Sequence, residues 1–329
     1  MEWRLRALTD LWTGDWTGDP QRLIPAGLLG SLRWWFEVLV RGLGGKACDP
    51  TVKEVRCPAK DKAPDDPGHH CVVCELFGCA SWARKFRFEV LEENGQPKQN
   101  QIRKDETFIL RFTELRPIYK DEWCLLCLTL RLIADYGAIG GKTVFKPTDE
   151  SNRQNAPHHQ DFGLISIEEP PATHCIRKDV ETYVRHRKWR TDFDDRDFSW
   201  ASLANFWCVK GRYLARQNSD TSSFNLVIGR QEPKNRGERF RADSTEFDKW
   251  LAGRPQESKK VFSFKEPPDA RRTFGFVNPG LQDSNQRPLD FNEICRRLKQ
   301  VWSDFQDSDL LEGRTILQFL LRSSSGGAA

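Results

Sequence analysis

Four cysteines give the clearest chemical signal in this sequence of 329 residues. Cys57, Cys71, Cys74 and Cys79 follow the spacing C-x13-C-x2-C-x4-C within a polar segment that lacks hydrophobic periodicity. Tetrahedral zinc takes four such thiolates, and a C-x2-C pair fixes two of them on one tight turn. Bound metal would also give a polar segment a defined shape without a core. The spacing therefore predicts a structural Zn²⁺ site.

The ligand set has alternatives. Cys48, His69 or His70 can each replace one of the four cysteines, and a set of unliganded thiols is the other interpretation. A catalytic zinc needs an open coordination position and a general base. Glu75 is the one nearby residue that offers a base, so the segment favours a structural metal.

A helix is predicted over residues 27–46, with one tryptophan out of place. At about 100° per residue, one broad arc collects the apolar side chains Leu28, Leu29, Leu32, Trp35, Phe36, Leu39, Val40 and Leu43. Arg33, Trp34 and Arg41 fall outside that arc. A tryptophan among arginines is suited to stacking on a nucleobase or on a partner protein. The alternative is that Trp34 and Trp35 are both core residues.

A glycine-rich turn follows a second apolar helix, predicted over residues 122–136. Gly137, Gly140 and Gly141 let the backbone approach a ligand closely, and exposed amides with Lys142 can hold phosphate groups. The glycine spacing is not that of a Walker motif. A plain helix C-cap also explains Gly137. Within the helix, Cys124 and Cys127 are predicted to be buried core thiols.

Bulk composition restricts the class of protein. Apolar residues make up 38% of the chain and charged residues 30%, with a net charge of +4. Basic runs at 84–87 and 184–190 can pair with phosphates, although acidic residues often follow closely. No segment reaches 18 consecutive apolar residues, and the charged N-terminus predicts no export. A cytoplasmic protein is therefore expected, with its ten cysteines as reduced thiols or metal ligands.

The order of elements predicts an α+β fold. A strand at 3–12, the first helix, a hairpin within 86–115 and the second helix are compatible with a ferredoxin-like sheet. We expect an N-terminal domain at 1–146 with a Cys-rich insertion at 48–82, a linker at 147–161, a C-terminal domain at 162–322 and a disordered tail at 323–329. The second half should contain strands at 162–169, 224–229, 260–265 and 273–277, and helices at 199–213 and 290–307.

Several segments together resemble a known family. They are TDLWTGD (9–15), LLGSLRWWFEVLVRGLGG (28–45), CDPT (48–51), the cysteine block at 71–87, the glycine turn and, more weakly, RTFGFVNPG (272–280). This set is similar to RAMP-superfamily proteins, in particular the Cmr-one subunit of type III-B CRISPR (Cmr) effector complexes. The resemblance covers about residues 5–146.

The resemblance implies two ferredoxin-like (RRM-related) domains, each an antiparallel sheet with helices on one face. It implies a non-catalytic, RNA-binding subunit at one end of an RNA-guided antiviral complex. Its partners would be the 3′ part of the guide RNA, the target RNA and other Cmr subunits, with no membrane. By position, Arg33, Trp34, Trp35, Arg41, Gly137, Gly140, Gly141 and Lys142 would face RNA.

Two other functions remain open. One is a RAMP-type endoribonuclease that processes CRISPR RNA, which would need a general acid and base among His158, His159, His174 and His186. The other is a zinc-stabilised scaffold that contacts only protein. No G-x-S-x-G, H-E-x-x-H or paired-carboxylate pattern supports a hydrolase.

Overall fold

A computed structural model describes residues 1–14, 19–50, 52–141, 147–154, 156–171, 173, 175–193, 198–230, 244–253 and 257–325. The chain divides into two compact units. Unit 1 comprises residues 1–142, 163–204 and 314–329, and unit 2 comprises residues 143–162 and 205–313.

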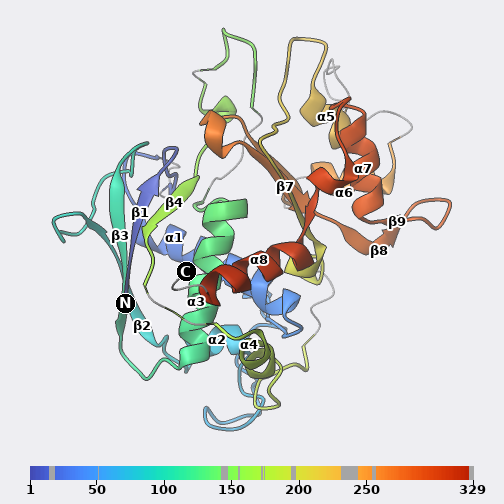
Figure 1. Ribbon diagram of the computed structural model, residues 1–329. Coiled ribbons are helices and arrows are strands. Elements are labelled where there is room, and N and C mark those ends of the chain that lie inside the picture. Colours follow the sequence, from blue (N-terminus) through green and yellow to red (C-terminus); the bar gives the residue numbers. More distant parts are fainter. Residues whose placement is uncertain are drawn as a thin grey trace. The chain divides into compact units, whose positions relative to one another are not determined.

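Unit 1 is built on a four-stranded antiparallel sheet (Figure 1). Alternate residues of its strands point to one face, where Trp3, Phe108 and Phe112 are buried. The strand order β2-β3-β1-β4 is that of a ferredoxin-like β-α-β-β-α-β unit. The strands are β1 (Glu2–Ala7), β2 (Phe86–Glu92), β3 (Thr107–Glu114) and β4 (Ile165–Glu169).

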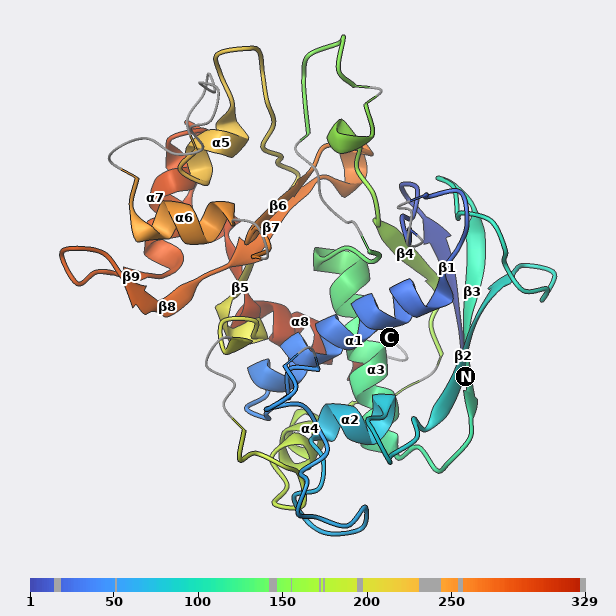
Figure 2. The ribbon, with the colours of Figure 1, turned by 180° about the vertical axis from the view of Figure 1, so that it is seen from behind.

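The two main helices of unit 1 pack against each other, as Figure 2 shows from behind. Helix α1 (Pro25–Gly42) begins with proline at its first turn, where the missing N–H costs nothing. Helix α3 (Lys120–Tyr136) buries a nearly continuous apolar surface. The shorter helices of the unit are α2 (Val72–Phe77), α4 (Arg177–Val184) and α8 (Gly313–Ser325), with the 3₁₀ turn Leu203–Asn205.

Unit 2 repeats the same topology around its own core. Its sheet has the order β10-β5-β7-β6, which is again that of a ferredoxin-like unit. The strands are β5 (Phe206–Lys210), β6 (Val261–Phe264), β7 (Arg272–Phe276) and β10 (Leu311–Glu312), and β8 (Asn278–Gln282) pairs with β9 (Pro288–Leu289). The helices are α5 (Ser223–Val227), α6 (Glu246–Ala252) and α7 (Phe291–Lys299), with 3₁₀ turns at Pro157–His159, Pro268–Ala270 and Asp307–Asp309.

The predicted fold class is confirmed, but the second half divides differently. The strand expected to open a second domain at 162–169 is β4, which pairs with β1 and completes the first sheet. Segment 147–161, the expected linker, belongs to unit 2. β1 would otherwise leave an open edge, and the buried Leu164 and Ile165 close it.

Two element predictions in unit 2 are wrong. The expected helix at 199–213 contains strand β5, because Phe206, Trp207 and Val209 are aromatic or β-branched and fully buried. The expected strand at 224–229 is helix α5, which Ser222 caps by accepting a hydrogen bond from the Asn225 amide. Short apolar runs carry no period that separates these alternatives.

Of the two cysteines of α3 predicted to be buried thiols, one is instead oxidised. Cys124 forms a disulfide with Cys175, which lies just before α4, while Cys127 is a free buried thiol as expected. The expected disordered tail is described as far as Ser325, where α8 ends. No helix within the described part of the chain is long and apolar enough to cross a membrane.

Candidate functional site

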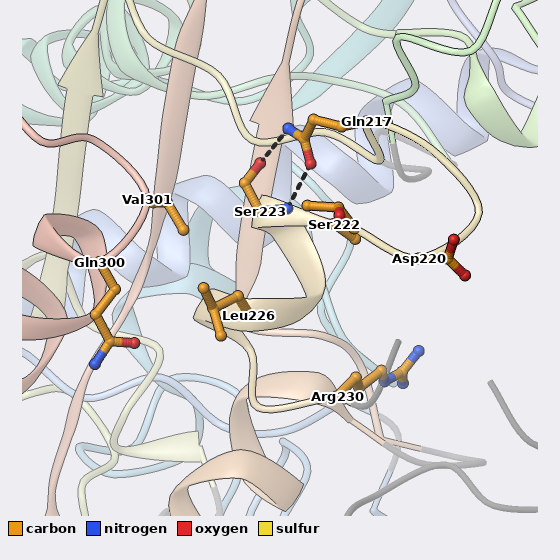
Figure 3. A pocket seen from close by; sticks show the side chains of 9 residues that line it. Gln217, Asp220, Ser222, Ser223, Leu226, Arg230, Gln300 and Val301 are labelled. Carbon is orange, nitrogen blue, oxygen red and sulfur yellow. Dashed lines mark hydrogen bonds between the residues drawn. The ribbon is translucent and has the colours of Figure 1, made fainter. Parts of the chain in front are cut away.

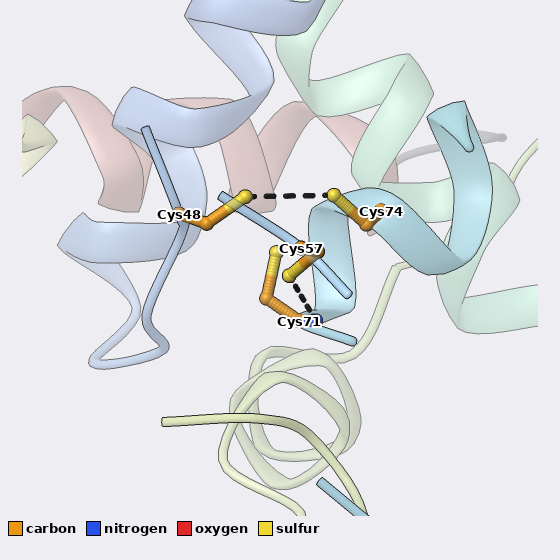
Figure 4. A group of neighbouring side chains, drawn as sticks. All are labelled: Cys48, Cys57, Cys71 and Cys74. Atoms are coloured by element: carbon orange, nitrogen blue, oxygen red, sulfur yellow. Dashed lines mark hydrogen bonds between the residues drawn. The ribbon is translucent and has the colours of Figure 1, made fainter. Parts of the chain in front are cut away.

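Four buried cysteines from separate segments meet in unit 1 (Figure 4). Cys48 follows α1, Cys57 lies in the loop beyond it, and Cys71 and Cys74 lie at the start of α2. Their Sγ atoms all lie within 4.8 Å of one another, and Cys48 Sγ is 3.5 Å from Cys74 Sγ. A tetrahedral zinc–thiolate site needs sulfur atoms about 3.8 Å apart. The four side chains can therefore hold a metal ion.

The ligand set differs from the predicted one by a single cysteine. Cys48 takes the place of Cys79, which is half-buried and outside the cluster. Gly78, at a φ of 84°, turns the chain after α2, and the Cys79 amide then donates to Trp82 O at 2.9 Å. Cys79 thus stays beside Cys74, with which it shares a side-chain hydrogen bond, whereas the loop after α1 carries Cys48 into the cluster.

The four thiols cannot all ionise without a cation. Burial opposes ionisation of Cys71, but hydrogen bonds from Cys48 and Cys57 hold the pKa of its thiol well below the ordinary value. The pKa of Cys74 is raised well above the ordinary value, mainly through its hydrogen bond with Cys48. One thiolate thus suppresses the ionisation of its neighbours, and a divalent ion would relieve this repulsion.

Arg33, predicted to face RNA, lies against this cluster. Its guanidinium donates to Cys74 Sγ at 3.3 Å, to Gly78 O at 3.2 Å and to Glu37 Oε1 at 3.0 Å. Burial acts to lower the pKa of Arg33, but Cys74 and Glu37 together raise it. The side chain is mostly buried, so its charge interacts with Cys74 of the cysteine cluster and with Glu37 of α1.

Trp35 and Arg41 are also interior residues, which corrects their predicted role. Trp35 is 2% exposed and donates from Nε1 to Ala138 O at 2.8 Å. Arg41 is buried and donates to Ala47 O and Ala201 O, both at 3.2 Å. RNA cannot reach either side chain in this structure. Trp34 is half-buried, with its ring edge-on to Trp35 at 5.0 Å.

The glycine turn meets α1, but its amides are engaged within the protein. The amide of Gly140 donates to Ser31 Oγ at 3.1 Å, and that of Gly141 donates to Trp12 O at 2.8 Å. A Cβ at Gly137 would lie 2.5 Å from the ring of Trp35. These glycines permit close packing, and their amides are not available to phosphates. Lys142 lies outside the described residues.

A buried polar chain, which the sequence did not reveal, connects the insertion to α3 and α4. His70 Nε2 lies 2.7 Å from Glu75, and Lys85 Nζ lies 2.6 Å from Glu75 and 2.7 Å from Glu122. The Tyr183 hydroxyl donates to Glu122 at 2.7 Å. Lys85 belongs to a basic run that could have paired with phosphate. Instead it is 3% exposed and neutralises two carboxylates.

The outer face of the N-terminal sheet carries several ion pairs. The aromatic side chains of β1 and β3 all point inward. The outward arginines are paired: Arg4 with Glu168 at 3.3 Å, Arg6 with Asp105 at 3.0 Å and Arg111 with Glu2 at 2.5 Å. Among the described residues of β1 and β3, no aromatic side chain is therefore exposed on this face for the base stacking through which RRM domains bind RNA.

The histidines proposed for catalysis are divided between the two compact units. His158 and His159 are neighbours in unit 2, whereas His186 lies in unit 1 and accepts a hydrogen bond from the Lys188 amide at 3.2 Å. His174 lies outside the described residues.

A shallow pocket of about 410 Å³ in unit 2 is lined mainly by polar residues (Figure 3). Its Gln217 side chain accepts from the Ser223 amide at 2.8 Å and donates to Ser223 Oγ at 2.9 Å. Both polar ends of that amide are thus occupied within the protein.

A comparison with protein families gives a match in the N-terminal half of the chain. The model of the RAMP superfamily matches residues 4–145, the part of the chain that carried the sequence resemblance. No curated protein gives a significant match.

Two solved structures align along almost the whole chain. One is Cmr1 from Pyrococcus furiosus in its apo form, with 10% identity, 98% of this chain and 95% of that chain covered, and a TM-score of 0.39. The other is a type III-B Cmr-beta complex bound to cognate target RNA and AMPPnP, with 9% identity, 98% and 99% coverage and a TM-score of 0.42. TM-scores below 0.5 are too low to establish a shared fold.

Proposed function

We propose that this chain, whose N-terminal domain belongs to the RAMP superfamily through residues 4–145, is a non-catalytic RNA-binding subunit of a type III-B CRISPR effector complex. The family match is the observation that carries the proposal. The Cmr-one resemblance of the helix and cysteine blocks supports the narrower assignment, as does the second ferredoxin-like unit. Guide RNA, target RNA and other Cmr subunits are the proposed partners, at one end of a cytoplasmic antiviral complex.

The role of this subunit is to bind RNA without cleaving it. Cleavage of RNA without metal needs an acid and a base that converge on one phosphodiester. The described candidates for these two roles are the histidine pair His158 and His159 of unit 2 and His186 of unit 1. Cleavage of repeat RNA by the isolated chain, abolished by substitution of a histidine, would favour the endoribonuclease alternative.

RNA binding is tested by its dependence on salt. Contacts to phosphates release counterions, so the logarithm of the affinity should fall linearly with the logarithm of salt concentration, by about 0.7 per contacted phosphate of a single strand. The full chain, alone and with its partner subunits, is titrated with labelled single-stranded RNA. Affinity that is absent or insensitive to salt would contradict the proposal.

Zinc is the proposed occupant of the cysteine cluster, bound by Cys48, Cys57, Cys71 and Cys74. Four buried thiolates suit a structural zinc ion, since no coordination position remains open for a substrate. The chemistry that the ion supplies is structural: it joins the end of α1 to α2. The test is metal content after purification without chelator. Cys48→Ser should lose most of the zinc, whereas the matched Cys79→Ser variant should keep about one ion per chain.

A further inference from the structure

A pocket of about 340 Å³ lies between α3 and α4 of unit 1. Figures 1 and 2 both show α4 beside one end of α3. The volume is at the lower end of the range for small-molecule sites and suits a single nucleotide. The pocket, called here the α3–α4 pocket, is lined by Asp121, Lys178, Asp179, Thr182, Tyr183, His186 and Lys188.

The rim of the α3–α4 pocket carries exposed cations next to an exposed aromatic ring. Lys178 and Lys188 are exposed, and neither forms a salt bridge with a described residue. Lys188 Nζ lies 4.2 Å from the ring centroid of Trp189 and 6.0 Å from that of Tyr119. The Tyr119 ring is 57% exposed, and Lys85 Nζ lies 4.6 Å from its centroid. Proteins that bind single-stranded RNA combine such cations, for the phosphates, with aromatic rings on which bases stack.

Two carboxylates line the same pocket. Asp121 and Asp179 both belong to the pocket lining, and burial, followed by the charge of Asp179, raises the pKa of Asp121. Neither forms a salt bridge with a described residue. Carboxylate oxygens accept hydrogen bonds from the amino groups of nucleobases.

The presence of both lysines and aspartates in the pocket lining favours one class of ligand over others. A basic peptide would meet the two lysines, and an acidic peptide would meet the two aspartates. A nucleotide carries both an anionic phosphate and a base that donates hydrogen bonds. It can place each group against the opposite part of the pocket.

We infer that the α3–α4 pocket binds one nucleotide of a single-stranded RNA. Lys178 and Lys188 hold the flanking phosphates, Tyr119 supports the base by stacking, and Asp121 and Asp179 accept its amino group. Uracil has no amino group, so the pocket prefers cytosine, adenine or guanine at this one position. The inference rests on the proposed RNA-binding function and locates a contact that its sequence resemblance did not assign.

The first experiment measures the contribution of the lysines. The full chain and a Lys178→Gln/Lys188→Gln variant are titrated with labelled oligo(rC) at several salt concentrations. Loss of two phosphate contacts should lower the salt slope by about 1.4. The control is Arg87→Gln/Lys104→Gln, which removes the same charge from exposed positions of unit 1 and should leave the slope unchanged.

The second experiment measures the choice of base. The wild-type chain should bind oligo(rC) more tightly than oligo(rU), and Asp121→Ala/Asp179→Ala should bring this ratio close to one. Tyr119→Ala should weaken binding of both by about tenfold. An unchanged unfolding midpoint shows that each variant is folded.

The outcomes separate two failures. If the wild-type chain shows no salt-dependent RNA affinity, the proposed function fails. If it binds RNA but the lysine variant keeps the wild-type slope and the aspartate variant keeps the base ratio, the pocket assignment is overturned. It is also overturned if the lysine variant binds RNA normally but no longer assembles with partner subunits, which would make the pocket a protein interface.

Discussion

The guanidinium of Arg33 donates hydrogen bonds to three acceptors at once. Its planar, forked donors reach a thiol, a carbonyl oxygen and a carboxylate from one position on α1. An N–H donor to a metal-bound thiolate spreads its charge and fixes its orientation. Arg33 is therefore a positioning residue for the proposed zinc site.

Replacing Arg33 with leucine should weaken metal retention while leaving the salt slope of RNA binding unchanged. Loss of an outer-shell partner typically costs about 10- to 100-fold in metal affinity. Competition with a coloured chelator measures this, with Arg87→Leu as a control, because Arg87 is exposed on the N-terminal sheet. If the Arg33→Leu variant retains metal normally but binds RNA more weakly, the prediction that Arg33 faces RNA is supported instead.

At the scale of elements, the packing of α1 on the end of α3 depends on one residue without a side chain. Trp35 fills the space beside Gly137, and its indole N–H caps the carbonyl of Ala138. The glycine turn therefore fixes the crossing of the two helices. Its glycines satisfy a steric requirement, although their pattern is equally typical of a phosphate-binding loop.

Gly137→Ala should destabilise unit 1 by about 1–3 kcal/mol, the usual cost of overpacking a filled core. The matched control is Gly30→Ala on α1, where an added Cβ meets nothing within 4 Å. Alanine has the higher helix propensity, so this variant should be more stable by about 0.5–1 kcal/mol. Urea unfolding compares the two variants, and equal effects would contradict the packing argument.

Asp161 joins two loops of unit 2, because its carboxylate accepts hydrogen bonds from the amides of Lys265 and Glu266. Burial raises its pKa to about 7, although the hydrogen bonds from these two amides and the charge of Lys265 act to lower the pKa. A raised carboxyl pKa means that the folded state binds the proton more tightly than the unfolded state. The resulting stability is complete below about pH 4 and is lost as the pH rises through about 7.

Asp161→Asn should remove this pH dependence, since an amide accepts the same hydrogen bonds without ionising. The difference in unfolding free energy between variant and wild type should shift in favour of the variant between pH 4 and pH 8. Urea unfolding across that range measures it. Asp269→Asn, at an exposed position of the same unit, is the control, and a pH-independent difference for Asp161→Asn would contradict the assignment.

At the scale of the molecule, each unit carries its own sheet and core. The cysteine cluster and the buried chain from His70 to Tyr183 both belong to unit 1. The proposed metal should therefore support one unit only, because binding energy of a structural ion is folding energy for the segments it joins.

Removal of metal should loosen unit 1 and leave unit 2 unchanged. Hydrogen exchange of the chelated protein should be faster in peptides from residues 46–85, which surround the cluster. Exchange in β5, β6 and β7 should match that of the untreated protein. Faster exchange in both units to the same extent would show that the ion stabilises more than its own unit.

The sequence by itself determined the ferredoxin-like class and the presence of a cysteine-rich insertion. Alternating strands, the amphipathic helix and the cysteine spacing are local features, readable without contacts. Local features also explain the errors in unit 2. Phe206–Lys210 and Ser223–Val227 are short runs without a decisive period, so packing selected their structure.

The tertiary structure alone decided which residues meet. It brought Cys48 rather than Cys79 to the cluster, turned Arg33 towards Cys74, buried Trp35 and Arg41, and paired β4 with β1. Each outcome depends on how a loop returns to a distant segment, and the sequence carries no local signal for such a return. Charge and residue type showed what chemistry was available, and long-range packing determined where that chemistry is used.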